Sequence, residues 1–245
     1  RTIRHNFCRH YRRSYLFPHF HAAALGTALK SVADEIIILN ARPLRESDLI
    51  VNYLGQDTGR NSALVRGARR SKKRFAGALE VFSHLDASLL PGRGSPSFTL
   101  EHAAIINVFP DLRLDLGRIC MASYFCELCE RLLPEAEPHP EVFELLRFFL
   151  ERLAASPASN KQRHFFEVRL LHHLGLLPDW RSLRVCAPTA EAMHEAAVCP
   201  LENLGGVRFT PGMAREARPI LLESIREHLG ALPRSLAMLE SEVTL

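Results

Sequence analysis

"EIIILNARPLRESDLIVNYLGQDTGRNSALVRGA", residues 35–68, is the stretch that predicts the fold of the first half of the chain. Its unbroken apolar run, Ile36 to Leu39, is typical of a buried strand within 35–44. A second strand is predicted at 47–55 and a third at 61–68, with Gly59 in the turn between them. The stretch therefore predicts three consecutive short strands.

Two more strands are predicted before the period of the sequence changes. Residues 78–92 alternate apolar side chains, and residues 97–109 form a last strand after a turn marked by Gly92 and Gly94. The alternating residues are Leu79, Val81, Leu85, Ala87 and Leu89. Five short strands within about 75 residues predict a small closed barrel. The spacing alone does not separate an OB barrel from an SH3-like barrel, so both stay open at this point.

After Pro110 the apolar residues recur every three or four positions, which is the period of a helix. Pro140 suits the first turn of a helix, and Gly175 is expected to end another. The helices are expected at 115–134, 140–155 and 163–180, with one or two closing helices within 218–241.

The segment before the closing helices, residues 181–210, has no steady period and is expected to be irregular. The predicted fold class is therefore α+β, with a five-stranded barrel over 34–110 and a mainly α-helical domain over 111–245. An irregular insert near 181–212 interrupts the helical part. The length of 245 residues suits one large domain or two small ones.

The composition is that of a globular protein, with 47% hydrophobic and 24% charged residues, enough to bury a core. No apolar run approaches the roughly 18 residues that a membrane span needs, so no membrane partner is predicted. The six cysteines follow no framework spacing, which indicates a reducing, cytoplasmic compartment.

Residues 1–33 differ from the rest because they carry six cations and no carboxylate. Such a composition is shared by organelle transit peptides, and the Ala-Leu stretch at 22–29 is faintly similar to part of a signal peptide. The simpler interpretation is a disordered basic extension or a start placed upstream of the true one. We therefore leave this segment out of the fold prediction.

The net charge of +4 hides an uneven distribution. Without residues 1–33 the chain carries 25 cations and 27 carboxylates, yet six cations fall within residues 66–74. These six are Arg66, Arg69, Arg70, Lys72, Lys73 and Arg74. Because neighbouring cations repel one another, such a run inside a non-basic body favours a polyanion as its partner, nucleic acid above all. A solvated surface loop is the alternative.

Further arginines extend this predicted nucleic-acid track, namely Arg42, Arg45 and Arg60. Lys and Arg read phosphates as charges and as donors, and small barrels often bind single strands along one face. No ladder of aromatic residues accompanies the cations, although Phe75 and Phe82 lie near them in the sequence. Phosphate contact is therefore better supported than base stacking.

No pattern in the chain predicts catalysis, a metal or a cofactor. Cys126 and Cys129 fall within a helical pattern whose neighbours are core residues, and Cys186, His194 and Cys199 have spacings that fit no common metal site. The sequence also lacks a phosphate-binding loop, a nucleophile elbow and a zinc-protease signature. We therefore expect a protein that is not an enzyme and has no cofactor.

Taken in order, several motifs resemble the bacterial recombination mediator RecO family. The likeness begins with a Glu-x-Asp near the second strand, at 46–48, and with Gly59 before the third. A Gly-Ala-Arg turn at 67–69 then opens the basic loop, which closes on Gly-x-Leu at 77–79. The later stretches similar to the family are 122–146, 165–180 with its Leu-Gly-x-x-Pro ending, 204–211 and 228–241.

The chain departs from the family pattern at three places. Many members have two Cys-x-x-Cys pairs that hold a zinc, but here Cys186 is followed by Thr189 and no second pair is present. The basic loop has Lys73 where members often have serine, and residues 1–33 match nothing in the family. Because of the first departure, we expect a helical domain that holds together without a zinc site.

The resemblance implies an OB-fold barrel that binds single- and double-stranded DNA, with a helical domain that docks partners. Members of the family anneal complementary strands and, with RecR, help to load RecA onto DNA coated by single-strand-binding protein. The acidic C-terminal tail of that protein would need a hydrophobic groove with a basic rim. Two alternatives stay open: an RNA-binding accessory protein with the same barrel and loop, and a scaffold whose loop binds an acidic protein.

Overall fold

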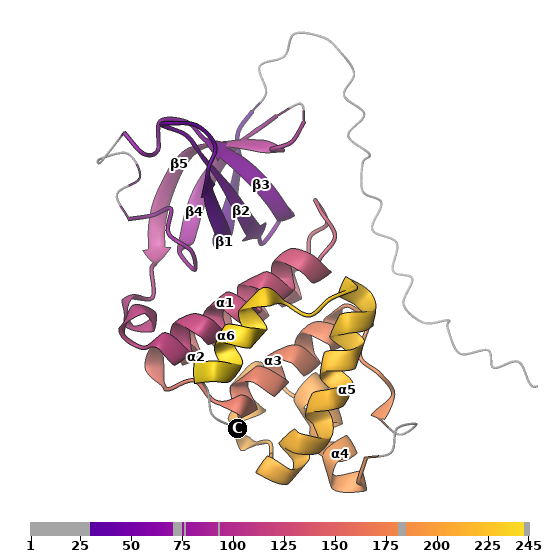
Figure 1. Ribbon diagram of the computed structural model, residues 1–245. Coiled ribbons are helices and arrows are strands. Elements are labelled where there is room, and N and C mark those ends of the chain that lie inside the picture. Colours follow the sequence, from indigo (N-terminus) through magenta and orange to yellow (C-terminus); the bar gives the residue numbers. More distant parts are fainter. Residues whose placement is uncertain (1–29, 71–74, 76, 93, 181–184, 243–245) are drawn as a thin grey trace, which may run out of the picture.

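The computed structural model describes residues 30–70, 75, 77–92, 94–180 and 185–242. Figure 1 shows a β-barrel that lies against one side of a group of helices. Nearly all of the predicted basic extension falls outside the described residues, and so do Lys72, Lys73 and Arg74 of the basic run.

The first half of the chain forms a closed barrel, as predicted. Its strands are β1 (Val32–Pro43), β2 (Leu49–Gly55), β3 (Gly59–Val65), β4 (His84–Pro91) and β5 (Phe98–Asn107). They close in the order β1-β2-β3-β5-β4, and only the β3–β5 pair is parallel. A five-stranded barrel of this kind is typical of the OB fold.

The prediction of a strand over 78–92 is wrong in its first part, because β4 begins only at His84. Residues 77–82 form turns, and Phe82 has a left-handed backbone with φ 77°. Apolar residues alternate in this turn because they pack against two different cores. Leu79 packs against the barrel interior, whereas Val81 packs against the core of the helical domain.

The second half of the chain is helical. Its first two α-helices match the predicted ranges closely, whereas the third lies at Asn160–His173 and ends seven residues before the predicted 163–180 does. The elements are η1 (Pro110–Leu114), α1 (Leu116–Leu132), α2 (Pro140–Ala155), α3 (Asn160–His173), α4 (Ala187–Val198), η3 (Leu201–Gly206), α5 (Pro211–Leu229) and α6 (Arg234–Glu242). The prediction that Gly175 ends α3 is confirmed. It has φ 68°, and the Leu176 N–H donates to the Leu171 carbonyl at 2.7 Å, as in a Schellman motif.

The expectation that residues 181–210 are irregular is wrong, because α4 and η3 occupy most of this segment. The helix has a physical basis in its composition. Ala and Met favour helices, and four such residues of α4 are buried: Ala192, Met193, Ala196 and Ala197.

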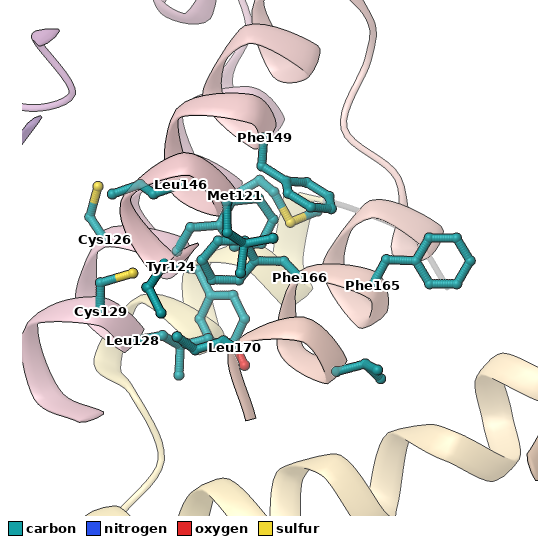
Figure 2. Close-up of a cluster of buried hydrophobic side chains, with 14 of the residues drawn as sticks. Met121, Tyr124, Cys126, Leu128, Cys129, Leu146, Phe149, Phe165, Phe166 and Leu170 are labelled. Atoms are coloured by element: carbon teal, nitrogen blue, oxygen red, sulfur yellow. The ribbon is translucent and has the colours of Figure 1, made fainter. Parts of the chain in front are cut away.

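The core of the helical domain is aromatic and continuous between α1, α2 and α3 (Figure 2). Phe125 stacks on Phe166 with ring centroids 3.9 Å apart, and Phe149 meets Phe125 edge-on at 5.6 Å. Cys126 and Cys129 are fully buried in this cluster, and burial raises the pKa of both thiols. The prediction that they are core residues is confirmed.

The last helix is attached to the first by a hydrogen-bonded carboxylate. Glu127 of α1 accepts the backbone N–H groups of Arg234 and Ser235, both at 2.9 Å, at the start of α6. The Ser235 hydroxyl donates to the same carboxylate at 2.6 Å. Glu127 therefore acts as an N-terminal cap supplied by another helix.

The barrel is held against the helical domain at the turn between β2 and β3. A Cβ atom on Gly59 would lie 2.1 Å from the Glu137 carbonyl oxygen, so only glycine permits this approach. The Arg60 Nε donates to the Leu133 carbonyl at 2.8 Å, and the Ala136 N–H donates to the Arg60 carbonyl at 2.9 Å. These contacts fix the barrel relative to the end of α1.

Candidate nucleic-acid interface

The basic run follows β3, and the described residues on either side of it, Val65 and Phe75, are buried in the barrel interior. Arg66, Arg69 and Arg70 are exposed where the loop begins. Phe75 and Ala78 are buried in the barrel interior, with 4% and 2% of their surface exposed, and they anchor its return. The described cations therefore face solvent while the apolar residues on either side hold the loop to the barrel.

The start of this loop is joined to the β1–β2 connection, residues 44–48. The Asp48 carboxylate accepts the backbone N–H of Gly67 at 2.8 Å, and the Arg69 N–H donates to the Ser47 carbonyl at 3.0 Å. The Gly67 N–H lowers the pKa of Asp48, and the Ser47 hydroxyl and the nearby Arg45 and Arg66 lower it further. The carboxylate is therefore ionised at neutral pH.

Arg45 lies in the β1–β2 connection, which hydrogen bonds from the Gly67 and Arg69 N–H groups join to the start of the basic loop. Arg70 lies 3.6 Å from Glu46, but both side chains are largely exposed, at 74% and 93%. An exposed pair of this kind contributes little free energy and is readily exchanged for another partner. The structure thus brings Arg45, Arg66, Arg69 and Arg70 together.

Arg42 and Arg60 line one polar groove of about 310 Å³ on the barrel. Asn52 of β2 and Ser62 of β3 lie opposite each other in the sheet and form part of its floor. Arg60 is held by its bond to Leu133, so it is less free than the loop arginines. In OB barrels the β2–β3 face is a common surface for oligonucleotides.

The sequence prediction did not include Asn52 or Ser62. Asn52 lies between the apolar Val51 and Tyr53, a pattern that places it on the outward face of its strand, whereas Ser62 follows the polar Asn61 and has no such signal. The same groove contains Glu135, and the Asn52 side chain donates to Glu130 of α1 at 2.5 Å. No aromatic side chain is among the described residues that line the groove. Its chemistry suits phosphate and sugar contacts better than base stacking.

A second groove, of about 460 Å³, lies in the helical domain between the end of α2, the start of α3 and η3. Phe148, Phe149 and Phe165 supply its apolar surface. Arg152 lies 5.5 Å from the ring centroid of Phe148, and the Lys161 Nζ lies 5.4 Å from that of Phe165. The groove is therefore apolar with a basic rim.

Comparison with known proteins identifies the family to which this architecture belongs. The family model described as "Recombination protein O N terminal" matches residues 29–109, and the one described as "Recombination protein O C terminal" matches residues 113–194. The chain belongs to the RecO family. The two matches meet where the barrel gives way to the helices.

Full-length relatives agree with this assignment. The DNA repair protein RecO of Myxococcus xanthus is 34% identical over 225 residues, which cover 80% of this chain and 92% of that protein. The protein of the same name from Geobacter metallireducens is 33% identical over 242 residues, 86% of this chain and 98% of the relative. The DNA repair protein RecO of Pelobacter propionicus is 41% identical over 150 residues, which cover 61% of this chain and 59% of that protein.

The zinc site implied by many RecO sequences does not fit the residues found here. The Cys186 Sγ lies 3.0 Å from the Thr189 hydroxyl, which donates to Glu216 of α5 at 2.8 Å, while Cys199 lies at the other end of α4. Across the described ranges no three His, Cys, Asp or Glu residues are placed to hold a metal. A hydrogen-bonded link between α4 and α5 takes that place in this RecO protein.

The described helices also bear on the membrane prediction. Within the part of the chain that the structure covers, none is both long and apolar enough to cross a bilayer.

Proposed function

We propose that this RecO chain is a non-enzymatic recombination mediator of DNA repair that binds single- and double-stranded DNA and anneals complementary strands. One observation carries the proposal: exposed arginines gather at one rim of an OB-type barrel in a chain of the RecO family. The proposed phosphate contacts are Arg69, Arg70, Lys72, Lys73 and Arg74, with Arg66 and Arg42 as weaker ones and Arg45 and Arg60 as extensions of the track.

The physics of annealing suits a cationic loop of this kind. Two single strands repel each other through their phosphates, and bound cations reduce that repulsion by replacing condensed counterions. Because phosphate contacts carry no base information, such a loop acts on any sequence. Among the described residues that line the barrel groove none is aromatic, which supports the same sequence-independent binding.

We further propose that the helical domain recruits this protein to coated DNA in the bacterial cytoplasm, at the nucleoid. Its apolar groove with a basic rim has the chemistry to hold the acidic C-terminal tail of single-strand-binding protein. Arg152 and Lys161 would face the acidic residues, and the phenylalanines would hold an apolar end. We propose that RecR is the direct partner of this chain when RecA is loaded onto DNA, and that this chain acts on RecA only indirectly.

An annealing assay tests the central proposal. Two complementary oligonucleotides, one labelled, are mixed with the intact protein or with a variant in which Arg69, Arg70, Lys72, Lys73 and Arg74 are alanine. We expect the intact protein to accelerate annealing and the variant to lose most of that acceleration. Equal acceleration by both proteins would remove the loop from the mechanism. Stronger binding of RNA than of DNA of equal length would favour the alternative RNA-binding function.

The tail groove is tested separately with a labelled acidic peptide that ends in apolar residues. We expect Arg152→Glu to weaken its binding strongly, because the substitution reverses a charge on the groove rim. Arg226→Glu is the matched control, since Arg226 is exposed on α5 and does not line the groove. Equal affinity of both variants would contradict this assignment.

A further inference from the structure

The Glu-x-Asp motif has no role in the proposed function so far, yet its aspartate makes the contact that joins two loops. Asp48 lies at the end of the β1–β2 connection, and Gly67 lies at the start of the basic loop, 19 residues later. Their 2.8 Å hydrogen bond and the 3.0 Å bond from the Arg69 N–H to the Ser47 carbonyl form a two-point link.

We infer that Asp48 is a positioning residue for DNA binding, which holds the first cations of the basic loop where phosphates reach them. The inference rests on the proposed function of this loop. Asp48 does not contact DNA in this scheme. It acts through the backbone of Gly67, which precedes Arg69 and Arg70 by two and three residues.

A physical need for such a link follows from the charges. Six cations within nine residues repel one another, so the loop tends to spread unless its backbone is fixed. Gly67 adopts φ 66°, a conformation that glycine permits and that presents its N–H to the carboxylate. Arg45 and Arg66 lie close enough to stabilise the charge of Asp48. The carboxylate thus joins both loops and offsets part of their repulsion.

Two neutral substitutions separate positioning from charge. Asp48→Asn keeps an oxygen that accepts the Gly67 N–H, whereas Asp48→Ala removes both the acceptor and the charge. We expect Asp48→Asn to bind a labelled single strand at least as tightly as the intact protein, because a negative charge near the phosphates is lost. Asp48→Ala should bind about fivefold more weakly than Asp48→Asn, the equivalent of one hydrogen bond of about 1 kcal/mol.

The dependence of DNA affinity on salt concentration is a second measurement, and a purely structural role of Asp48 would leave it unchanged. With its loop no longer held, Asp48→Ala should engage fewer phosphates and show a shallower dependence of log affinity on log salt than Asp48→Asn. Equal affinity and equal slope of the two variants would overturn the inference. Failure of the proposed function is distinct, since the intact protein would then bind as weakly as its five-alanine loop variant.

Amide hydrogen exchange of the intact protein tests the link without any variant. The N–H groups of Gly67 and Arg69 should be protected in the absence of DNA, because both are hydrogen-bonded. Exchange at the rate of an unstructured peptide at both positions would overturn the inference, even if Asp48→Ala fails to fold.

Discussion

The contact of Gly59 with the α1–α2 connection makes a prediction that can be worked out quantitatively. In Gly59→Ala the new Cβ would lie 2.1 Å from the Glu137 carbonyl oxygen and 2.5 Å from its carbonyl carbon. Both are backbone atoms, so the barrel and the helical domain must move apart. Overpacking of this kind costs about 1–3 kcal/mol, and the left-handed φ of 72° adds about 1–2 kcal/mol for a residue with a Cβ. We expect the free energy of unfolding to fall by about 2–5 kcal/mol.

Gly230→Ala is the matched control for this substitution. Gly230 ends α5 with φ 73°, nearly the same backbone conformation, but no atom lies within 4 Å of its added Cβ. Gly230→Ala should therefore lower the free energy of unfolding only by the cost of placing a residue with a Cβ in the left-handed conformation. The assay is urea unfolding followed by circular dichroism, with both variants compared with the intact protein. Equal destabilisation by the two substitutions would refute the claim that Gly59 holds the two parts of the molecule in close contact.

Two further predictions concern links between helices. Burial opposes ionisation of Glu127, but the hydrogen bonds from Ser235 and Arg234 outweigh it and lower the pKa of its carboxyl. Its contribution to stability should be complete above the unfolded pKa of about 4.3 and be lost as the pH falls through the lower folded pKa. Glu127→Gln should therefore destabilise the protein at pH 7, and by progressively less as the pH falls below about 4, as thermal unfolding measures. Thr189→Val should lower the free energy of unfolding only modestly, because the exposed Glu216 carboxylate of α5 loses the Thr189 hydroxyl but keeps the Cys186 N–H, at 3.2 Å, as a donor. A chelator should leave the melting temperature unchanged.

Much of the barrel could be predicted from the sequence because its signals are local. The apolar run at Ile36 to Leu39 and the glycine turns depend on neighbours within a few residues. The same local reasoning failed at 78–83, where alternating residues belong to two different cores. It failed again at α4, because the buried face of this helix consists mostly of small alanines rather than of large apolar side chains.

The candidate site was predictable in composition but not in arrangement. The density of cations marks the loop, yet nothing near Asp48 in the sequence shows that it accepts a hydrogen bond from Gly67. Arg60 was grouped with the loop cations because of its charge, whereas its bond to Leu133 spans 73 residues. Contacts between residues so far apart in the sequence depend on how the barrel and the helices pack, which local sequence patterns do not encode.

The most direct test of the central claim is a salt titration of single-strand binding. The intact protein is compared with a variant in which Arg66, Arg69 and Arg70 are alanine, and with a control that replaces the exposed Arg208, Arg215 and Arg226 of the helical domain. We expect the slope of log affinity against log salt to become shallower by about 2 in the loop variant, from about 0.7 per phosphate contact, and to stay unchanged in the control. Equal slopes and affinities for the two triple variants would contradict the assignment of the loop as the DNA site.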